Sequence, residues 1–116
     1  MKNLPKEKKM SITEFFQELM EFDKSKFDLN YTGSFKSDVK SCYKSGFDLR
    51  LLCDVIKMLA ENGFLPAKYR PHLLKGKKLM ECHILPDDWL LVWQQNDKEL
   101  TLLLINTGTH AKILRM

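Results

Sequence analysis

Three histidines are the first candidates for chemistry, and all lie in the second half of the chain: His72, His83 and His110. A histidine side chain titrates near neutral pH, so two of them beside a phosphodiester can act as general base and general acid. RNA supplies its own nucleophile, the 2′-hydroxyl, and needs proton transfer and cationic groups for cleavage. These residue types point to ribonuclease chemistry, although for each histidine alone an ordinary structural position is the simpler interpretation.

A basic segment between Pro66 and His83 contains five Lys and Arg residues against a single acid, so its net charge equals the +4 of the whole chain. Such a segment attracts phosphate through its long-range field and through counterion release. The alternative is a solvated loop without a partner. The predicted phosphate-binding residues are Arg70, Lys75, Lys77 and Lys78.

A metal site is not expected. The histidines are separated by 11 and 27 residues, which matches no familiar zinc pattern, and the cysteines form no CxxC pair. An odd number of cysteines favours reduced thiols in the core of a cytoplasmic protein; these are Cys42, Cys53 and Cys82. We see no export signal and no apolar run long enough to cross a bilayer, so no membrane association is expected.

Two acids and two tryptophans lie close to His83 in the sequence. Asp87 and Asp88 could orient a histidine, although a turn between strands also selects aspartate for backbone reasons. Trp89 and Trp93 fall on the same side of a strand, where core packing is the default and base stacking the exception.

The elements that must position these side chains follow from hydrophobic periodicity and turn signals. Ser11 and Glu14 have the spacing of a capping box and open a predicted amphipathic helix over 11–22. Two more helices end near Gly46 and Gly63 and form a helical hairpin. Predicted strands occupy 27–31, 79–85, 89–93 and 99–105, with turns at 86–88 and 95–97.

The length of 116 residues, with 44% hydrophobic and 29% charged residues, permits one domain with a single modest core. The order of elements predicts an α+β fold. In it the helical hairpin packs on one face of a small antiparallel sheet, and a short helix or turn ends the chain. The other face of the sheet remains free for a site.

Three blocks of sequence, in this order, resemble the YafQ toxins of the RelE superfamily. They are Tyr-Arg-Pro-His-Leu-Leu-Lys-Gly at 69–76, His-Ile-Leu-Pro-Asp-Asp-Trp-Leu-Leu-Val-Trp at 83–93 and Thr-Gly-Thr-His-Ala at 107–111. The likeness extends back to the strand near Phe27. It implies a RelE-like toxin domain over 27–116 and an N-terminal extension over 1–26.

The resemblance implies a toxin of a type II toxin–antitoxin system, an endoribonuclease (mRNA interferase) without a cofactor. It would bind the 30S/70S ribosome in the cytoplasm, cut mRNA in the ribosomal A site and be held inactive by a cognate antitoxin. The family's catalytic set falls here on His72, His83, Asp88 and His110. Either His83 or His110 would be the general base and the other the general acid. Asp88 would orient a histidine or take part in the proton transfer.

This sequence departs from the family pattern in four places. The turn before Trp89 has one extra residue, so Asp87 could replace Asp88 as the functional carboxylate. Glu81 stands where an aspartate is usual and is a second alternative carboxylate, because its longer side chain could reach differently. Leu114 stands where an aromatic is common. Trp89 or Leu114 could line the site or stack on a base. The fourth departure is the extension 1–26, whose amphipathic helix must bury its apolar face on this chain's own sheet or hairpin, on an antitoxin, or on a second copy.

Two other functions remain open at this point. The same superfamily fold hosts ParE-like toxins that poison DNA gyrase without cutting RNA, so fold alone does not give function. A non-catalytic RNA-binding regulatory domain is the third possibility, and it would depend on the basic segment rather than on the histidines.

Overall fold

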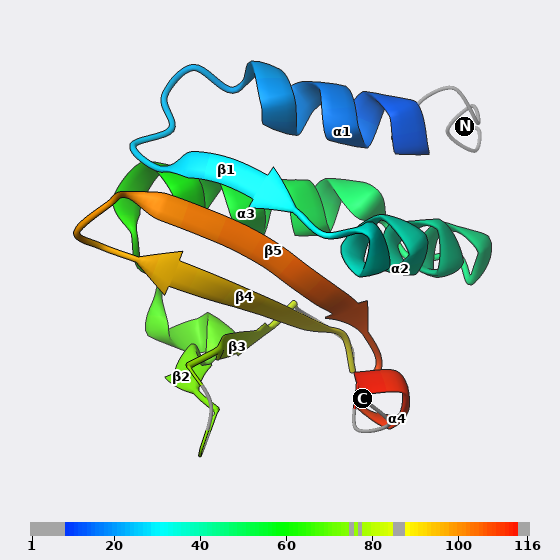
Figure 1. Ribbon diagram of the computed structural model, residues 1–116. Coiled ribbons are helices and arrows are strands. Elements are labelled where there is room, and N and C mark those ends of the chain that lie inside the picture. The colour runs from blue at the N-terminus through cyan, green and yellow to red at the C-terminus, as the bar shows by residue number, and fades with distance from the viewer. Residues whose placement is uncertain (1–8, 75, 77, 85–87, 114–116) are drawn as a thin grey trace.

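The computed structural model describes residues 9–74, 76, 78–84 and 88–113 (Figure 1). The order is a helix, a strand, two helices, a run of strands and a short last helix, as expected of an α+β fold. The elements are α1 (Ile12–Glu21), β1 (Asp28–Tyr31), α2 (Gly33–Lys44), α3 (Leu49–Asn62), a 3₁₀ helix (Ala67–Tyr69), β2 (His72–Leu73), β3 (Met80–His83), β4 (Leu90–Asn96), β5 (Thr101–Gly108) and α4 (His110–Ile113).

Local capping explains where the helices begin and end. Ser11 and Glu14 form the predicted capping box of α1, each side chain bonded to the other's backbone N–H. Thr32 caps α2, and the Asp48 side chain caps α3. α3 ends at Gly63, whose φ of +81° and close approach to the Phe27 ring exclude a larger residue.

The five strands form one mixed sheet in the order β1-β5-β4-β3-β2. The predicted antiparallel sheet is correct for β2 to β5, but β1 runs parallel to β5, with Leu29 opposite Leu102. A parallel pair needs a long crossover connection, and here α2, α3 and three strands lie between the partners. The two-residue strand β2 was not predicted, because a pair of residues carries no periodicity.

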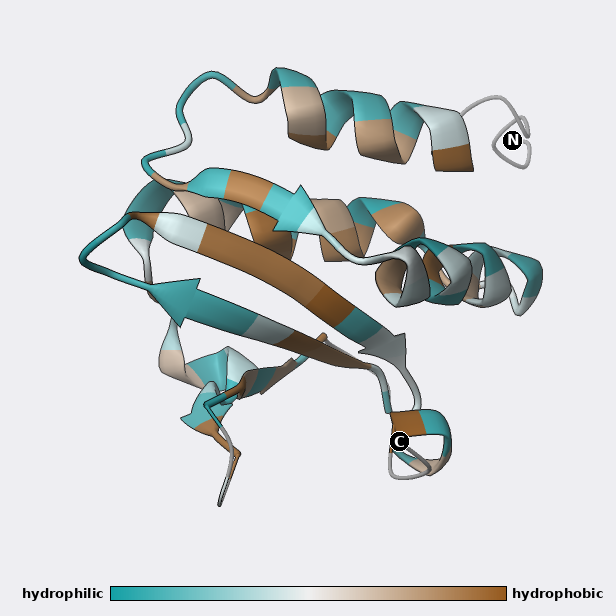
Figure 2. Ribbon diagram, in the orientation of Figure 1, coloured by the Kyte–Doolittle hydropathy of each residue, from teal (hydrophilic) through white to brown (hydrophobic). Residues whose placement is uncertain are grey.

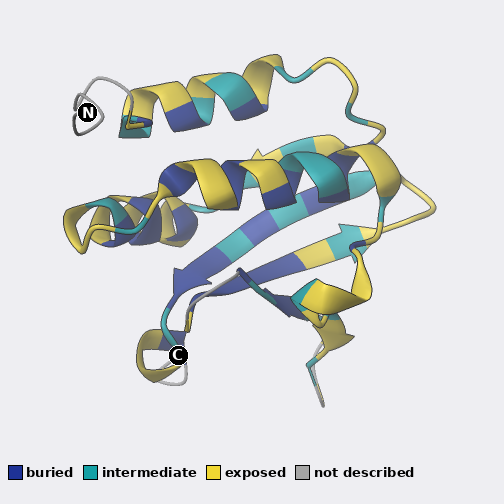
Figure 3. Ribbon diagram, turned by 180° about the vertical axis from the view of Figure 1, so that it is seen from behind, coloured by how far each residue is buried: buried dark blue, intermediate teal, exposed yellow. Residues whose placement is uncertain are grey.

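The main core lies between the helices and one face of the sheet. Seen from behind in Figure 3, α3 crosses the sheet and turns buried positions toward it. The largest fully buried side chains include Phe15, Phe35, Ile56, Trp93 and Leu104. Figure 2 shows that β5 is apolar along its middle, and that β4 is apolar toward the α4 end and polar toward the β4–β5 turn. The opposite face of the sheet carries a smaller apolar cluster that contains Ile113 of α4.

The N-terminal helix packs on the chain's own helical hairpin, which confirms one of the three arrangements considered for it. Phe15 and Leu19 of α1 belong to the main core. On the same helix, Glu18 accepts two hydrogen bonds from the Arg50 guanidinium, both at 3.0 Å, and contacts the Lys57 ammonium on α3. α1 therefore shares its core with the rest of the fold.

All three cysteines are free and buried, as expected of core residues. Burial raises the pKa of Cys42 and Cys53 to about 11 and that of Cys82 to about 12. Thiols with such pKa values are poor nucleophiles, so we assign them to packing. Within the part of the chain that the structure describes, no helix is long and apolar enough to cross a membrane.

Candidate active site

The candidate site lies on the sheet face opposite the main core. Side chains alternate along β3, so Met80 and Cys82 pack into the main core while Glu81 and His83 point to the other face. The cross-strand partners of Glu81 and His83 on β4 are Val92 and Leu90. Both of those residues belong to the smaller cluster on that face, so the site stands on a packed apolar floor.

His72 is held at both ring nitrogens. Its Nδ1 lies 2.8 Å from the Arg70 carbonyl oxygen, and its Nε2 lies 3.1 Å from Glu81 Oε1 on the neighbouring strand. A carbonyl can only accept, so Nδ1 carries a proton. Arg70 has a positive φ of 53°, a conformation that is costly for a residue other than glycine and that here turns its carbonyl toward the ring.

His110 and Asp88 form a second histidine–carboxylate pair. Asp88 Oδ1 lies 2.6 Å from His110 Nδ1 and also accepts the His110 backbone N–H at 3.3 Å. These hydrogen bonds from His110 lower the pKa of the Asp88 carboxyl, so it is ionised at neutral pH. An ionised carboxylate only accepts, so His110 Nδ1 carries the proton and Nε2 is left for a substrate.

His83 stands between these two pairs. Its ring centroid is 6.3 Å from that of His72 and 5.9 Å from that of His110. Burial lowers the pKa of the His83 imidazole, and the nearby Arg70 charge lowers it further. His83 is therefore neutral at pH 7 and able to accept a proton. The three rings form one row, the histidine row (His72, His83 and His110).

The structure brings together the four residues expected to be catalytic, and it pairs Glu81, expected as an alternative carboxylate, with His72. Arg70 is exposed beside the row, whereas Lys78 lies before β3, at the strand end opposite His83. Four of the expected site residues lie outside the described residues: Lys75, Lys77, Asp87 and Leu114.

One expectation is wrong. Trp89 is only 3% exposed, its ring packs against Phe47 with centroids 4.8 Å apart, and its Nε1 donates to Thr107 Oγ1 at 2.8 Å. The indole ring is buried in the core, so neither of its faces is accessible for stacking on a base. Trp93 is also buried, in agreement with core packing as the default expectation for the two tryptophans.

Comparison with known proteins places this geometry in a family. Residues 27–115 match the family described as the bacterial toxin of the type II toxin–antitoxin system, YafQ. The chain belongs to the YafQ family.

Two relatives from Escherichia coli and one from Helicobacter pylori illustrate the similarity to known toxins. The mRNA interferase toxin YafQ of E. coli strain K12 is 36% identical over 89 residues, which cover 74% of this chain and 94% of the relative. The E. coli DinJ–YafQ complex superposes with a TM-score of 0.69 at 34% identity, covering 76% and 98% of the two chains. A metal-bound toxin from H. pylori gives a TM-score of 0.67 at 40% identity, covering 75% and 98%.

These relatives confirm the expected RelE-like α+β fold, with the correction that the sheet is mixed. Nearly the whole length of each solved relative aligns with this chain, whereas about a quarter of this chain has no counterpart in them. α1 is thus an addition to a complete YafQ fold, and it is built into the core of this member.

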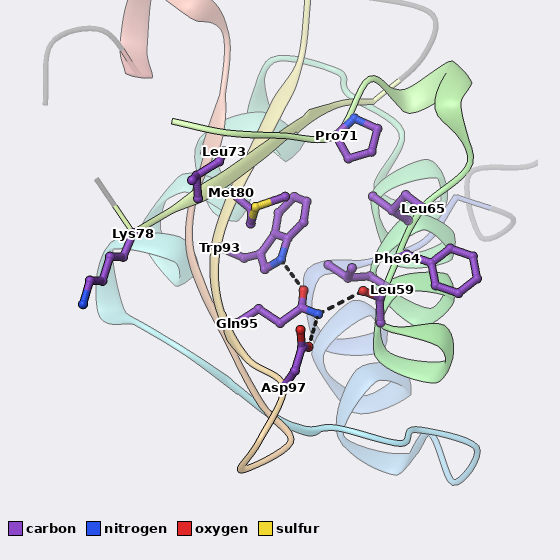
Figure 4. A pocket seen from close by; sticks show the side chains of 11 residues that line it. Leu59, Phe64, Leu65, Pro71, Leu73, Lys78, Met80, Trp93, Gln95 and Asp97 are labelled. Carbon is purple, nitrogen blue, oxygen red and sulfur yellow. Dashed lines mark hydrogen bonds between the residues drawn. The ribbon is translucent and has the colours of Figure 1, made fainter. Parts of the chain in front are cut away.

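A cavity of about 440 Å³ lies on the other side of β2 from the histidine row (Figure 4). Leu73 and Met80 line it together with Trp93, whose Nε1 donates to Gln95 Oε1. His72 and Leu73 alternate along β2, so the row and the cavity face opposite sides of the sheet. The candidate site is therefore an open row on the sheet surface and is separate from this pocket.

Among the described residues, no cluster of three or more His, Cys, Asp or Glu side chains is arranged to hold a metal ion. Each carboxylate of the row is directed to one histidine, Glu81 to His72 and Asp88 to His110. The arrangement is suited to moving protons and holding phosphate.

Proposed function

We propose that this chain is a metal-independent endoribonuclease that cuts mRNA in the ribosomal A site, with the RNA 2′-hydroxyl as nucleophile. In the reaction, the 2′-oxygen bonds to phosphorus while the bond from phosphorus to the 5′-oxygen breaks. The 2′-proton goes to a base and the 5′-oxygen receives a proton from an acid. The products are a 2′,3′-cyclic phosphate and a free 5′-hydroxyl.

The observation that carries this proposal is the histidine row with a carboxylate partner at each end. Two imidazoles 5.9 Å apart, His83 and His110, can reach opposite sides of one phosphoryl group. A chain that only bound RNA would need the basic segment but not this pairing of rings and acids.

His83 is the proposed base and His110 the proposed acid. Burial and Arg70 lower the pKa of His83, which keeps it neutral and ready to take the 2′-proton. The ionised Asp88 can carry the countercharge of a protonated His110, which donates to the 5′-oxygen. His72, held by Glu81 and the Arg70 carbonyl, offers a further donor to the phosphoryl oxygens.

Cationic side chains offset the charge of the phosphate. Arg70 is exposed beside the row and close enough to lower the pKa of His83, so it can contact the scissile phosphate. Lys78 lies before β3, at the strand end opposite His83, and also lines the cavity of Figure 4. We propose that it contacts another phosphate of the RNA together with Lys75 and Lys77.

The partners follow from the same family. The E. coli relative is named an mRNA interferase, and its complex with DinJ is described as a toxin–antitoxin complex. We propose that this chain acts in the cytoplasm on the 30S/70S ribosome and that a cognate antitoxin holds it inactive. Residues 27–116 form the proposed toxin domain, with 1–26 as an extension. The named activity of the relative favours RNA cleavage over the poisoning of DNA gyrase.

The test is cleavage of a defined mRNA by the purified chain, with and without programmed ribosomes, comparing wild type with His110→Ala. Discrete cuts that need ribosomes and disappear in the folded variant support the proposal. Cuts that persist in His110→Ala, or no cuts from antitoxin-free folded protein, contradict it.

A chelator arm tests the absence of a metal requirement. The H. pylori relative was found metal-bound, so metal binding must be separated from catalysis here. We expect equal rates in a chelator selective for transition metals, with the Mg²⁺ that ribosomes need kept in the buffer, and in added Cu²⁺ or Zn²⁺. A rate that falls in chelator and returns with metal would contradict the metal-free reaction while leaving RNA cleavage intact.

A further inference from the structure

A buried acid joins three elements behind the candidate site. Asp38 of α2 is 6% exposed, and its Oδ2 accepts the Asn106 side-chain amide at 2.9 Å and the Thr107 backbone N–H at 3.1 Å. Its Oδ1 pairs with Lys112 Nζ of α4 at 3.0 Å. A buried carboxylate with every partner in place fixes the groups around it.

The same network holds chain neighbours of both members of the His110–Asp88 pair. Thr107 Oγ1 donates to the Leu90 carbonyl at 2.7 Å and accepts from Trp89 Nε1 at 2.8 Å. Trp89 directly follows Asp88 in the chain, and Lys112 lies two residues after His110. Bonds from Asp38 and Thr107 therefore flank the catalytic pair on each side.

The short helix α4 depends on these tertiary contacts. It has only four residues, His110–Ile113, and a helix of that length is not stable by itself. One end is held where Ile113 packs on Leu90 and Val92. The Lys112 side chain crosses Gly108 to reach Asp38, and a Cβ on Gly108 would lie 3.2 Å from Lys112 Cδ.

We propose that Asp38 is a positioning residue for RNA cleavage. Through Asn106, Thr107 and Lys112 it fixes the end of β5 and the start of α4, and so sets the His110 ring against Asp88. The rate consequence rests on the proposed function, whereas the anchoring of α4 does not. Small errors in the placement of a catalytic group reduce kcat without a matching change in KM.

The experiment uses the exposed end of the network, because Asp38→Asn alone could fail to fold. Lys112→Gln removes the ion pair, Lys112→Arg retains it, and Glu18→Gln breaks an ion pair on α1 as a matched control. Backbone order parameters of residues 110–113 and kcat and KM on programmed ribosomes are measured for each variant, with Asp38→Asn added if it folds.

For residues 110–113 we expect backbone order parameters of about 0.85 in wild type and Lys112→Arg, and below about 0.6 in Lys112→Gln. We expect kcat to fall about tenfold in Lys112→Gln, with KM within about twofold, and to be restored in Lys112→Arg. Asp38→Asn should lose at least as much, and Glu18→Gln should keep the wild-type kcat.

An unchanged kcat in Lys112→Gln overturns the proposal, as does a loss confined to KM, which would make Lys112 a direct phosphate contact. Equal loss in Glu18→Gln overturns it too, because general destabilisation would then explain the effect. If the wild type cuts no RNA, the proposed function fails, and rigid order parameters in Lys112→Gln would overturn the anchor separately.

Discussion

His72 and Glu81 face each other across β2 and β3, with His72 Nε2 3.1 Å from Glu81 Oε1. The Glu81 side chain is only 11% exposed, so its charge is poorly hydrated and its histidine partner compensates for that. His110 and Asp88 repeat the arrangement at the other end of the row. Both ends of the candidate site are thus held by a carboxylate from a different strand or loop.

Glu81→Gln tests the first of these pairs. The amide keeps an acceptor oxygen but loses the charge that holds and balances His72, so we expect kcat to fall roughly tenfold with the fold retained. Cleavage on programmed ribosomes and circular dichroism check this. Glu99→Gln, at an exposed acid in the β4–β5 turn, is the control and should cut like wild type. Equal rates for both variants would remove Glu81 from the site.

The pKa of His83 should respond in opposite directions to its two charged neighbours. The Arg70 charge lowers the pKa of His83 and the Glu81 charge raises it, after the larger effect of burial. Arg70→Gln should therefore raise the pKa of His83, and Glu81→Gln should lower it further. NMR titration of the His83 ring measures both. Shifts of the same sign in the two variants would contradict the arrangement of charges.

Glu18 makes the attachment of α1 dependent on pH. Hydrogen bonds from Arg50 and then Lys57 lower the pKa of Glu18 from 4.5 to about 2. Because the folded-state pKa is the lower one, the stabilisation is complete above about pH 4.5 and is lost as the pH falls toward about 2. Solvent screens this 36%-exposed side chain, so we expect roughly 1 kcal/mol.

Urea unfolding at neutral and acidic pH measures this contribution. Glu18→Gln should lose stability at neutral pH and show a weaker loss on acidification than wild type. Glu21→Gln, on the same helix, should behave like wild type. Parallel pH profiles for wild type and Glu18→Gln would show that the ion pair makes no net contribution.

Trp89→Phe separates a core role from base stacking. The change removes the donor to Thr107 Oγ1 from a buried site, so we expect a loss of about 1–2 kcal/mol in the free energy of unfolding. KM for programmed ribosomes should stay within about twofold of wild type. A raised KM with unchanged stability would mean that the indole contacts RNA instead of the core.

The helices were predictable because their signals are local. The Ser11–Glu14 capping box and the stop at Gly63 depend on residues within one turn of each helix end. The pairing of β1 with β5 was not predictable, since nothing near Leu29 indicates Leu102 as its neighbour. Long-range pairing is set by how the whole core closes.

In the candidate site, too, some features could be predicted from local sequence and others depend on the folded chain. Residue type and motif order pointed to His72, His83, Asp88 and His110, and the structure brings these four together. The role of Glu81 toward His72 depends on the register of a two-residue strand, and that of the Arg70 carbonyl on a positive φ. Asp38 carries no motif, and its buried contacts exist only in the folded chain.

The most direct test of the proposed chemistry changes one atom of the RNA. An mRNA with a single 2′-deoxy nucleotide on the 5′ side of the cut is presented on programmed ribosomes, with the all-ribose mRNA as control. We expect the deoxy substitution to abolish the cut at that position and the control to yield a 2′,3′-cyclic phosphate and a 5′-hydroxyl. Cleavage of the deoxy mRNA at an undiminished rate, or a linear phosphate formed directly, would contradict attack by the 2′-hydroxyl and the roles assigned to the histidine row.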